Sequence, residues 1–202
     1  MKKISTFLLL VIAPAVYAES FFYSYTNVFQ AEADTYLVGQ TNAQKINEGI
    51  VKYYAPIALD TPASLTYHFA LANTITNAAL YAHIASYNFG AGSQGFGSLW
   101  ASKDGSSWQL LMDAPTPSGI AAGYFYDQAL PGELLGGTDI WIQARIQSSG
   151  SDIMSQFSRT DDTVPSEVFQ FSAETVPEPS TYALLGIGAI GLLMVLRKKK
   201  TA

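Results

Sequence analysis

Apolar and polar residues alternate along the middle of the chain with the two-residue period of β-strands. In residues 64–71, SLTYHFAL, the apolar side chains of Leu65, Tyr67 and Phe69 fall on one face of a strand, and the residues between them fall on the other. This alternation is typical of a strand with one face in a hydrophobic core and one face in water. We therefore expect a half-buried strand here.

The same period recurs in residues 139–147, DIWIQARIQ. The expected inward residues are Ile140, Ile142, Ala144 and Ile146, and the expected outward residues are Trp141, Gln143, Arg145 and Gln147. Similar short runs, separated by clusters of Gly, Pro, Asn, Asp and Ser, fill residues 19–175, and no amphipathic helix or internal repeat interrupts them. About nine or ten strands in one segment predict an all-β domain, a two-sheet β-sandwich of jelly-roll type.

One tight hairpin is predicted within residues 97–112, with its turn at Asp104 and Gly105, because Asp-Gly is a favoured turn dipeptide. Its SKDGSSW sequence, residues 102–108, resembles the Asp-box hairpin of sialidases, shortened by one residue. The resemblance implies a structural element in which the aspartate caps the turn and Trp108 packs beneath it. We therefore expect Trp108 to support folding.

The amino-terminal residues 1–18, MKKISTFLLLVIAPAVYA, have a basic start, an apolar run at 7–13 and small residues at the end. These features are typical of a secretory signal peptide rather than of a permanent anchor, because the apolar run is too short to span a bilayer. Val16 and Ala18 fit the small-residue positions of a cleavage site. We expect export through the secretion translocon and signal-peptidase cleavage between Ala18 and Glu19.

A second membrane-directed segment lies at the carboxyl end. Residues 181–196 carry no charge and as a helix would extend roughly 24 Å, slightly less than the roughly 30 Å hydrocarbon core. The basic cluster that follows consists of Arg197, Lys198, Lys199 and Lys200. It predicts a transmembrane helix with a cytoplasmic tail at 197–202. The GIGAIG stretch at 186–191 matches a dinucleotide-binding pattern but lacks the preceding strand and the rest of the βαβ unit, so that function is excluded.

The residues just before this span are Val176, Pro177, Glu178, Pro179 and Ser180. Together with the span and the basic cluster, this motif at 176–180 makes residues 176–202 resemble the PEP-CTERM sorting signal of Gram-negative bacteria. The resemblance implies processing by an exosortase in an organism that makes exopolysaccharide. It also implies export across the inner membrane, transient anchoring by the carboxyl-terminal helix, and final delivery to the outer surface or extracellular matrix.

Residues 19–175, which we call the passenger domain, are strongly acidic. Of the chain's 16 acidic residues only Glu178 lies outside this segment, whereas six of the 11 basic residues do, which leaves 15 acidic against 5 basic residues. A nucleic-acid partner is not expected for such a domain. The chain has no cysteine, so packing without disulfides must stabilise one domain of ordinary size.

Aromatic residues beside polar ones are the candidate ligand contacts, because sugars pack their C–H faces on flat rings while their hydroxyls bond to polar groups. Trp141 with Gln143 and Arg145 forms the first candidate group, and Tyr124 with Tyr126 forms the second. The alternation places Trp141 on the outer face of its strand. We therefore expect its removal to weaken glycan binding and to leave stability nearly unchanged.

Metal and catalytic sites are only weakly indicated. Glu32 and Asp34 in FQAEAD are calcium candidates, because this stretch is similar to the opening of jelly-roll carbohydrate-binding modules, where an early glutamate helps to hold a structural calcium. The two histidines, His68 and His83, are expected on polar strand faces rather than in a zinc site. No serine-hydrolase motif or defined carboxylate pair is present, and no cofactor other than structural calcium is expected.

These observations favour a non-catalytic surface or matrix protein associated with exopolysaccharide or biofilm. A calcium-stabilised lectin-like module and a polysaccharide hydrolase are the two alternatives. The sequence specifies how the protein is delivered more closely than what the passenger domain binds.

Overall fold

The computed structural model describes residues 18–160 and 168–176, and this part of the chain folds as twelve β-strands with three short 3-10 helices. The strands are β1 (Glu19–Tyr25), β2 (Leu37–Thr41), β3 (Ala43–Glu48), β4 (Val51–Pro56), β5 (Ala63–Ala70), β6 (Thr74–Tyr87), β7 (Ser93–Ser102), β8 (Gln109–Ala114), β9 (Ala121–Ala129), β10 (Asp139–Gly150), β11 (Ser155–Thr160) and β12 (Phe169–Val176). The 3-10 helices are η1 (Ala31–Asp34), η2 (Gly90–Gly92) and η3 (Gly132–Leu134).

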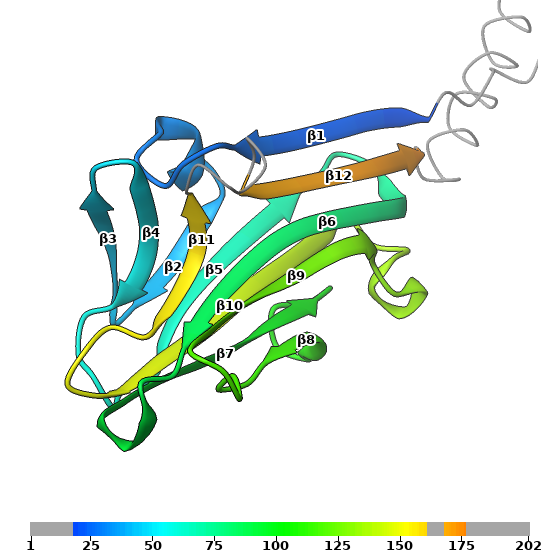
Figure 1. Ribbon diagram of the computed structural model, residues 1–202. Helices are drawn as coiled ribbons and strands as arrows, with labels where there is room; N and C mark the ends of the chain where they lie inside the picture. Colours follow the sequence, from blue (N-terminus) through cyan, green and yellow to red (C-terminus); the bar gives the residue numbers. More distant parts are fainter. Residues whose placement is uncertain (1–17, 161–167, 177–202) are drawn as a thin grey trace, which may run out of the picture.

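The strands form two antiparallel sheets (Figure 1). The seven-stranded sheet has the order β1-β12-β6-β11-β4-β3, with β9 also paired to β6, and the five-stranded sheet has the order β2-β5-β10-β7-β8. Apart from the β7–β8 hairpin, consecutive strands from β4 to β11 alternate between the sheets. The predicted all-β, two-sheet class is confirmed, with twelve described strands instead of nine or ten. The jelly-roll type stays a prediction.

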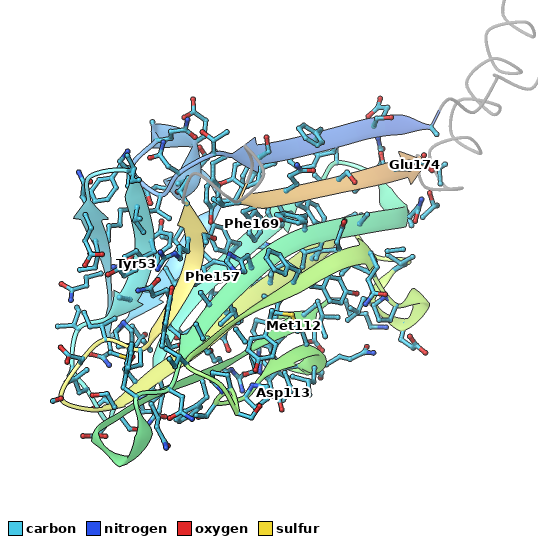
Figure 2. The ribbon with its side chains drawn as sticks, viewed as in Figure 1. Tyr53, Met112, Asp113, Phe157, Phe169 and Glu174 are labelled. Carbon is cyan, nitrogen blue, oxygen red and sulfur yellow. The ribbon has the colours of Figure 1, made fainter. Side chains whose placement is uncertain are left out.

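The hydrophobic core lies between the sheets and follows the predicted alternation. The inward residues of β5 and β10 are at most 1% exposed: Leu65, Tyr67, Phe69, Ile140, Ile142, Ala144 and Ile146. Phe157 of β11 and Phe169 of β12, both labelled in Figure 2, pack on Tyr67 from the other sheet, with ring centroids 6.4 and 4.8 Å from that of Tyr67. Burying these large side chains supplies the stability that disulfides would otherwise add.

Three hydroxyl groups inside the core hydrogen-bond to one another. The Tyr25 hydroxyl lies 2.9 Å from the Tyr67 hydroxyl and 2.8 Å from Oγ of Ser158, and all three residues are buried. A buried hydroxyl without a hydrogen-bond partner would lower the stability of the folded protein. Because these three hydroxyls bond to one another, they can lie inside an apolar core. Burial raises the pKa values of Tyr25 and Tyr67 well above the usual value for tyrosine.

Strand β6 organises the larger sheet. Its Thr74–Ala82 part pairs with β12, and its Ile84–Ser86 part pairs with β11 on the same edge. The opposite edge pairs with β9. Strand β12, the last described strand, therefore lies between β6 and the edge strand β1.

The membrane-directed segments fall mainly outside the described residues. The predicted signal peptide includes only one described residue, Ala18, and neither the predicted span at 181–196 nor the tail at 197–202 is described. Residues 18–160 and 168–176 contain no helix with the length and apolar character needed to cross a membrane.

Candidate functional site

The two ends of the described domain lie next to each other in one antiparallel ladder. Glu19, the first residue of β1, is the partner of Thr175 in β12, and the pairing continues to Tyr25 and Phe169 (Figure 1). The Thr175 hydroxyl donates a hydrogen bond of 3.4 Å to the Glu19 carbonyl oxygen. The Asn73 side-chain amide donates a bond of 2.9 Å to the Glu19 carboxylate. The predicted signal-cleavage site therefore adjoins the predicted sorting motif.

Candidate glycan residues lie on the outer face of the five-stranded sheet, where Trp141 is paired with His68 of β5. The imidazole and indole rings are stacked, 3.6 Å between centroids and 7° between planes. Nε2 of His68 lies 2.7 Å from Oδ1 of Asp139. Hydrogen bonds from the Thr138 hydroxyl and from His68 lower the pKa of Asp139. His68 thus covers one ring face of Trp141 and is itself held in place by a carboxylate.

The β7–β8 turn lies against the same indole. The Asp104 carboxylate accepts hydrogen bonds from the backbone N–H groups of Ser107 and Ser106, at 2.7 and 2.8 Å, which lower its pKa and confirm the predicted turn cap. Gly105 has φ +71°, and a Cβ atom at Gly105 would lie 3.1 Å from Cε2 of Trp141. The turn therefore packs on Trp141, so this outer-face ring has contacts that the alternation pattern did not predict.

Arg145 is the centre of the remaining polar group on this face. Its guanidinium carbon lies 4.5 Å from the ring centroid of Trp100 and 6.0 Å from that of Trp108. Nε of Arg145 donates a 2.6 Å hydrogen bond to Oε1 of Gln143, whose amide donates to Thr66. The two terminal amino groups of Arg145 make no hydrogen bond within the described part of the chain.

A shallow depression of about 150 Å³ borders Arg145. Its side chains include Phe96 and Ser98 of β7, Asp113 of β8 and Gln147 of β10. Phe96 is 38% exposed. The alternation pattern predicts that Gln147 lies on the same face as Arg145. It does not predict Phe96 or Asp113 there, because the pairing of β7 with β10 and β8 brings those two residues beside Arg145.

The second candidate glycan group is corrected by the structure. Tyr126 is only 4% exposed, and its hydroxyl donates to the Ala129 carbonyl oxygen. Tyr124, two residues earlier and on the same face of β9, packs against the core. The outward residues of this strand are Phe125 and Asp127. Tyr126 is therefore a core residue and cannot form an exposed sugar platform, and Tyr124 shares its inward face.

Within the described residues, Glu32 and Asp34, the calcium candidates, are not gathered with further acidic ligands. Asp34 already has protein partners. Nζ of Lys45 lies 2.6 Å from Oδ2 of Asp34, and Tyr54 donates to Oδ1 of the same carboxylate at 3.2 Å. Glu32 is exposed, and its carbonyl oxygen accepts a bond from Tyr23. Across the described ranges, no three His, Cys, Asp or Glu side chains come close enough to hold a metal ion.

The two histidines lie on different sheets. The sequence predicted a solvent-facing His83, but this residue of β6 is only 3% exposed. The ring of Phe125 from β9 stacks on its imidazole, with 4.3 Å between the ring centroids. It lines a depression of about 270 Å³ on the seven-stranded sheet, and a second depression there has about 410 Å³. Tyr87 and Arg159 border both of them. The sequence pattern did not indicate this surface, since its residues come from separate strands.

Comparison with known families identifies the carboxyl end. The model of the PEP-CTERM protein-sorting motif matches residues 175–199. The chain carries a PEP-CTERM sorting motif. This motif implies export and processing by an exosortase. The match begins at Thr175, so its first two residues, Thr175 and Val176, belong to β12. The predicted motif residues Pro177, Glu178, Pro179 and Ser180 lie outside the described residues.

No curated protein matches the chain, and two of the solved structures that it resembles are distant from it. A chain from infectious bursal disease virus, Gt strain, is 10% identical with a TM-score of 0.35, over 81% of this chain and 41% of the viral chain. A CBM4 structure is 10% identical with a TM-score of 0.30, over 78% of this chain and 85% of the other. This chain thus spans less than half of that viral chain. Similarities this distant do not indicate what the passenger domain binds.

Proposed function

We propose that this protein is exported, processed by an exosortase at its PEP-CTERM motif and delivered to the cell surface or extracellular matrix. There its passenger domain binds exopolysaccharide without catalysing a reaction. The sorting motif supports the first part of this proposal. The second part depends on the arrangement around Arg145.

The Arg145 group combines the two kinds of contact that carbohydrate ligands use. Trp100, Trp108 and Phe96 provide aromatic surface on the outer face of β7 and beside it. Gln143 fixes Nε of Arg145, so the terminal amino groups can donate to a sugar hydroxyl or carboxylate with little loss of side-chain freedom. The single observation that carries the binding proposal is this stacked and oriented guanidinium with available donors.

Exopolysaccharide from the producing cells provides the direct binding test. We expect Arg145→Gln to weaken retention of the purified passenger domain by about tenfold, since a hydrogen bond to a charged group contributes about 1.5–3 kcal/mol. Lys103→Gln removes the same charge from an exposed turn residue and should leave retention unchanged. Equal losses in both variants would indicate nonspecific charge attraction and contradict an Arg145 site.

Replacing Pro177 and Pro179 by alanine tests the sorting part. Prolines disfavour helical backbone, so the substitutions would allow the predicted helix at 181–196 to extend toward the domain and enclose the processed region in helical hydrogen bonds. We expect a full-length, membrane-bound form to accumulate. Fractionation of cells and mass spectrometry of the carboxyl terminus would measure it. Trimming at the parental rate would show that the triplet is only a spacer.

Deleting residues 197–200 should have a different effect. This deletion removes the positive charge that holds the carboxyl end in the cytoplasm. We expect some chains to pass through the membrane with their tail uncut. The same fractionation would detect untrimmed protein outside the cells, whereas the proline variant should stay in the membrane.

A further inference from the structure

The junction between the passenger domain and its sorting motif lies inside a β-sheet. Thr175 and Val176 are the last residues of β12 and also the first residues of the motif match. Thr175 is paired with Glu19 of β1 on one side and with Ile75 of β6 on the other. Val176 is paired with Thr74 of β6. The start of the motif is therefore held in an extended conformation by the folded domain.

Side chains strengthen this arrangement at the outer edge of the ladder. The Asn73 side-chain amide donates a hydrogen bond to the Glu19 carboxylate, and the Thr175 hydroxyl donates one to the Glu19 carbonyl oxygen. Thr76 donates to the carbonyl oxygen of Glu174, one residue before the match begins. Thr175 itself is only 4% exposed. These contacts hold the end of β12 against both neighbouring strands.

We propose that the β1–β12–β6 ladder fixes the backbone of Thr175 and Val176, the first two residues of the motif match, and so positions the start of the sorting motif for the exosortase. The proposal rests on the proposed exosortase processing and adds what the passenger domain contributes to it. Pro177 follows Val176 directly in the sequence, so no linker separates the ladder from the Pro-Glu-Pro triplet. An enzyme that binds an extended peptide then does not have to order Thr175 and Val176, because the fold has already fixed their backbone.

The ladder also links the two processing events. Glu19 becomes the first residue of the exported protein if the signal peptide is removed after Ala18, and it pairs with the first residue of the motif match. Four residues, 177–180, separate Val176 from the predicted span, and an extended chain of that length reaches roughly 14 Å. While the tail is anchored, this end of the domain therefore lies close to the membrane surface.

A flexible insertion tests whether the exosortase needs the motif to follow a fixed strand end or needs only to reach it. Inserting Gly-Ser-Gly-Ser between Val176 and Pro177 in the full chain lengthens the connection between the domain and the predicted span, and it separates the triplet from β12. We expect pulse–chase measurements in the producing cells to show tail removal slowed roughly tenfold, since ordering each residue costs about 1–2 kcal/mol. The same insertion after Gly119, in an exposed loop with open space around it, should leave the rate unchanged.

A milder variant tests the ladder without changing the motif. Asn73→Ala removes the bond to the Glu19 carboxylate, and we expect tail removal to slow by about two- to fivefold. Resistance of the passenger domain to added protease would confirm that each variant is folded. Tail removal at the parental rate or faster in the Val176–Pro177 insertion variant would overturn the proposal. If the Pro177→Ala/Pro179→Ala variant is trimmed normally, the triplet is only a spacer and the exosortase part of the proposed function is wrong, whatever the insertion does.

Discussion

The imidazole ring of His68 lies parallel to the indole ring of Trp141, with the two centroids 3.6 Å apart. Gly105 of the β7–β8 turn also packs on this indole. Because the ring contacts both a neighbouring strand and a turn, we expect Trp141→Ala to lower the free energy of unfolding by about 2–3 kcal/mol, somewhat less than a fully buried tryptophan. Urea unfolding measures this loss. An unchanged midpoint would instead support the expectation from the sequence that removing Trp141 leaves stability nearly unchanged.

Gly105 is expected to be the most sensitive glycine of the turn region. Gly105→Ala introduces a side chain at φ +71° and places its Cβ 3.1 Å from the Trp141 ring. We expect a loss of about 1–3 kcal/mol in the free energy of unfolding, from backbone strain and from crowding together.

Two matched glycines separate these causes. Gly49→Ala has φ +78° with no atom within 4 Å of the new Cβ, so it measures backbone strain alone. Gly119→Ala has neither problem, since its φ is ordinary and its surroundings are open. We expect losses in the order Gly105, Gly49, Gly119. Equal losses for Gly105 and Gly49 would show that the Trp141 ring moves aside without cost.

Alternation predicted which residues of β5 and β10 face inward, because one buried face imposes a strict period of two. It gave no orientation for β9, because residues 123–127, GYFYD, have aromatic side chains on both faces of the strand. Alternation also placed Trp141 outward correctly but could not show that a turn would cover it. The Tyr25–Ser158 bond joins residues 133 positions apart, and no local pattern indicates such a contact.

The amino terminus of the exported protein provides a test of the secretion interpretation. We expect it to be Glu19, since Ala18 ends the small-residue junction and the ordered ladder begins at the next residue. Amino-terminal sequencing of protein from the cell envelope would determine it. Retention of Met1 in exported protein would contradict cleavage of a signal peptide.

The lowered pKa of Asp139 leads us to expect a loss of stability in acid. Its pKa is lowered in the folded state by the Thr138 and His68 hydrogen bonds, so its contribution is present above the unfolded carboxyl pKa of about 4. That contribution is lost as the pH falls through the lower, folded-state pKa. We therefore expect the difference in melting temperature between the parent and Asp139→Asn to shrink below about pH 4.

Asp127→Asn is the control for this titration. Asp127 is an exposed carboxylate on β9 and makes no hydrogen bond within the described residues. At pH 7 the free energy of unfolding of this variant should stay close to that of the parent, as for other substitutions of exposed residues. A parent–Asp139→Asn difference that stays constant from pH 7 to pH 3 would show that the hydrogen bonds to Asp139 do not depend on its charge.

The raised pKa values of the buried tyrosines lead us to expect a second loss of stability, at alkaline pH. Burial raises the pKa values of Tyr25, Tyr54 and Tyr67 above the unfolded value of about 10. Below that value all three are neutral in both states, and their contribution is fully present. Above it the unfolded chain loses protons that the folded chain keeps, so stability falls with rising pH until the folded-state pKa is reached.

The expected slope is about 1.4 kcal/mol per pH unit for each such tyrosine. Tyr67→Phe removes one titrating group together with its bond to Tyr25, so it should lower stability at pH 7 and make the alkaline slope shallower. Phe169→Leu is the matched control, because it weakens packing against the Tyr25 and Tyr67 rings but keeps every tyrosine. Urea unfolding between pH 9 and pH 11.5 should therefore give a parental slope for Phe169→Leu and a reduced slope for Tyr67→Phe. A slope for Tyr67→Phe equal to the parental slope would mean that the Tyr67 phenol ionises as readily in the folded chain as in the unfolded one, and would contradict the prediction.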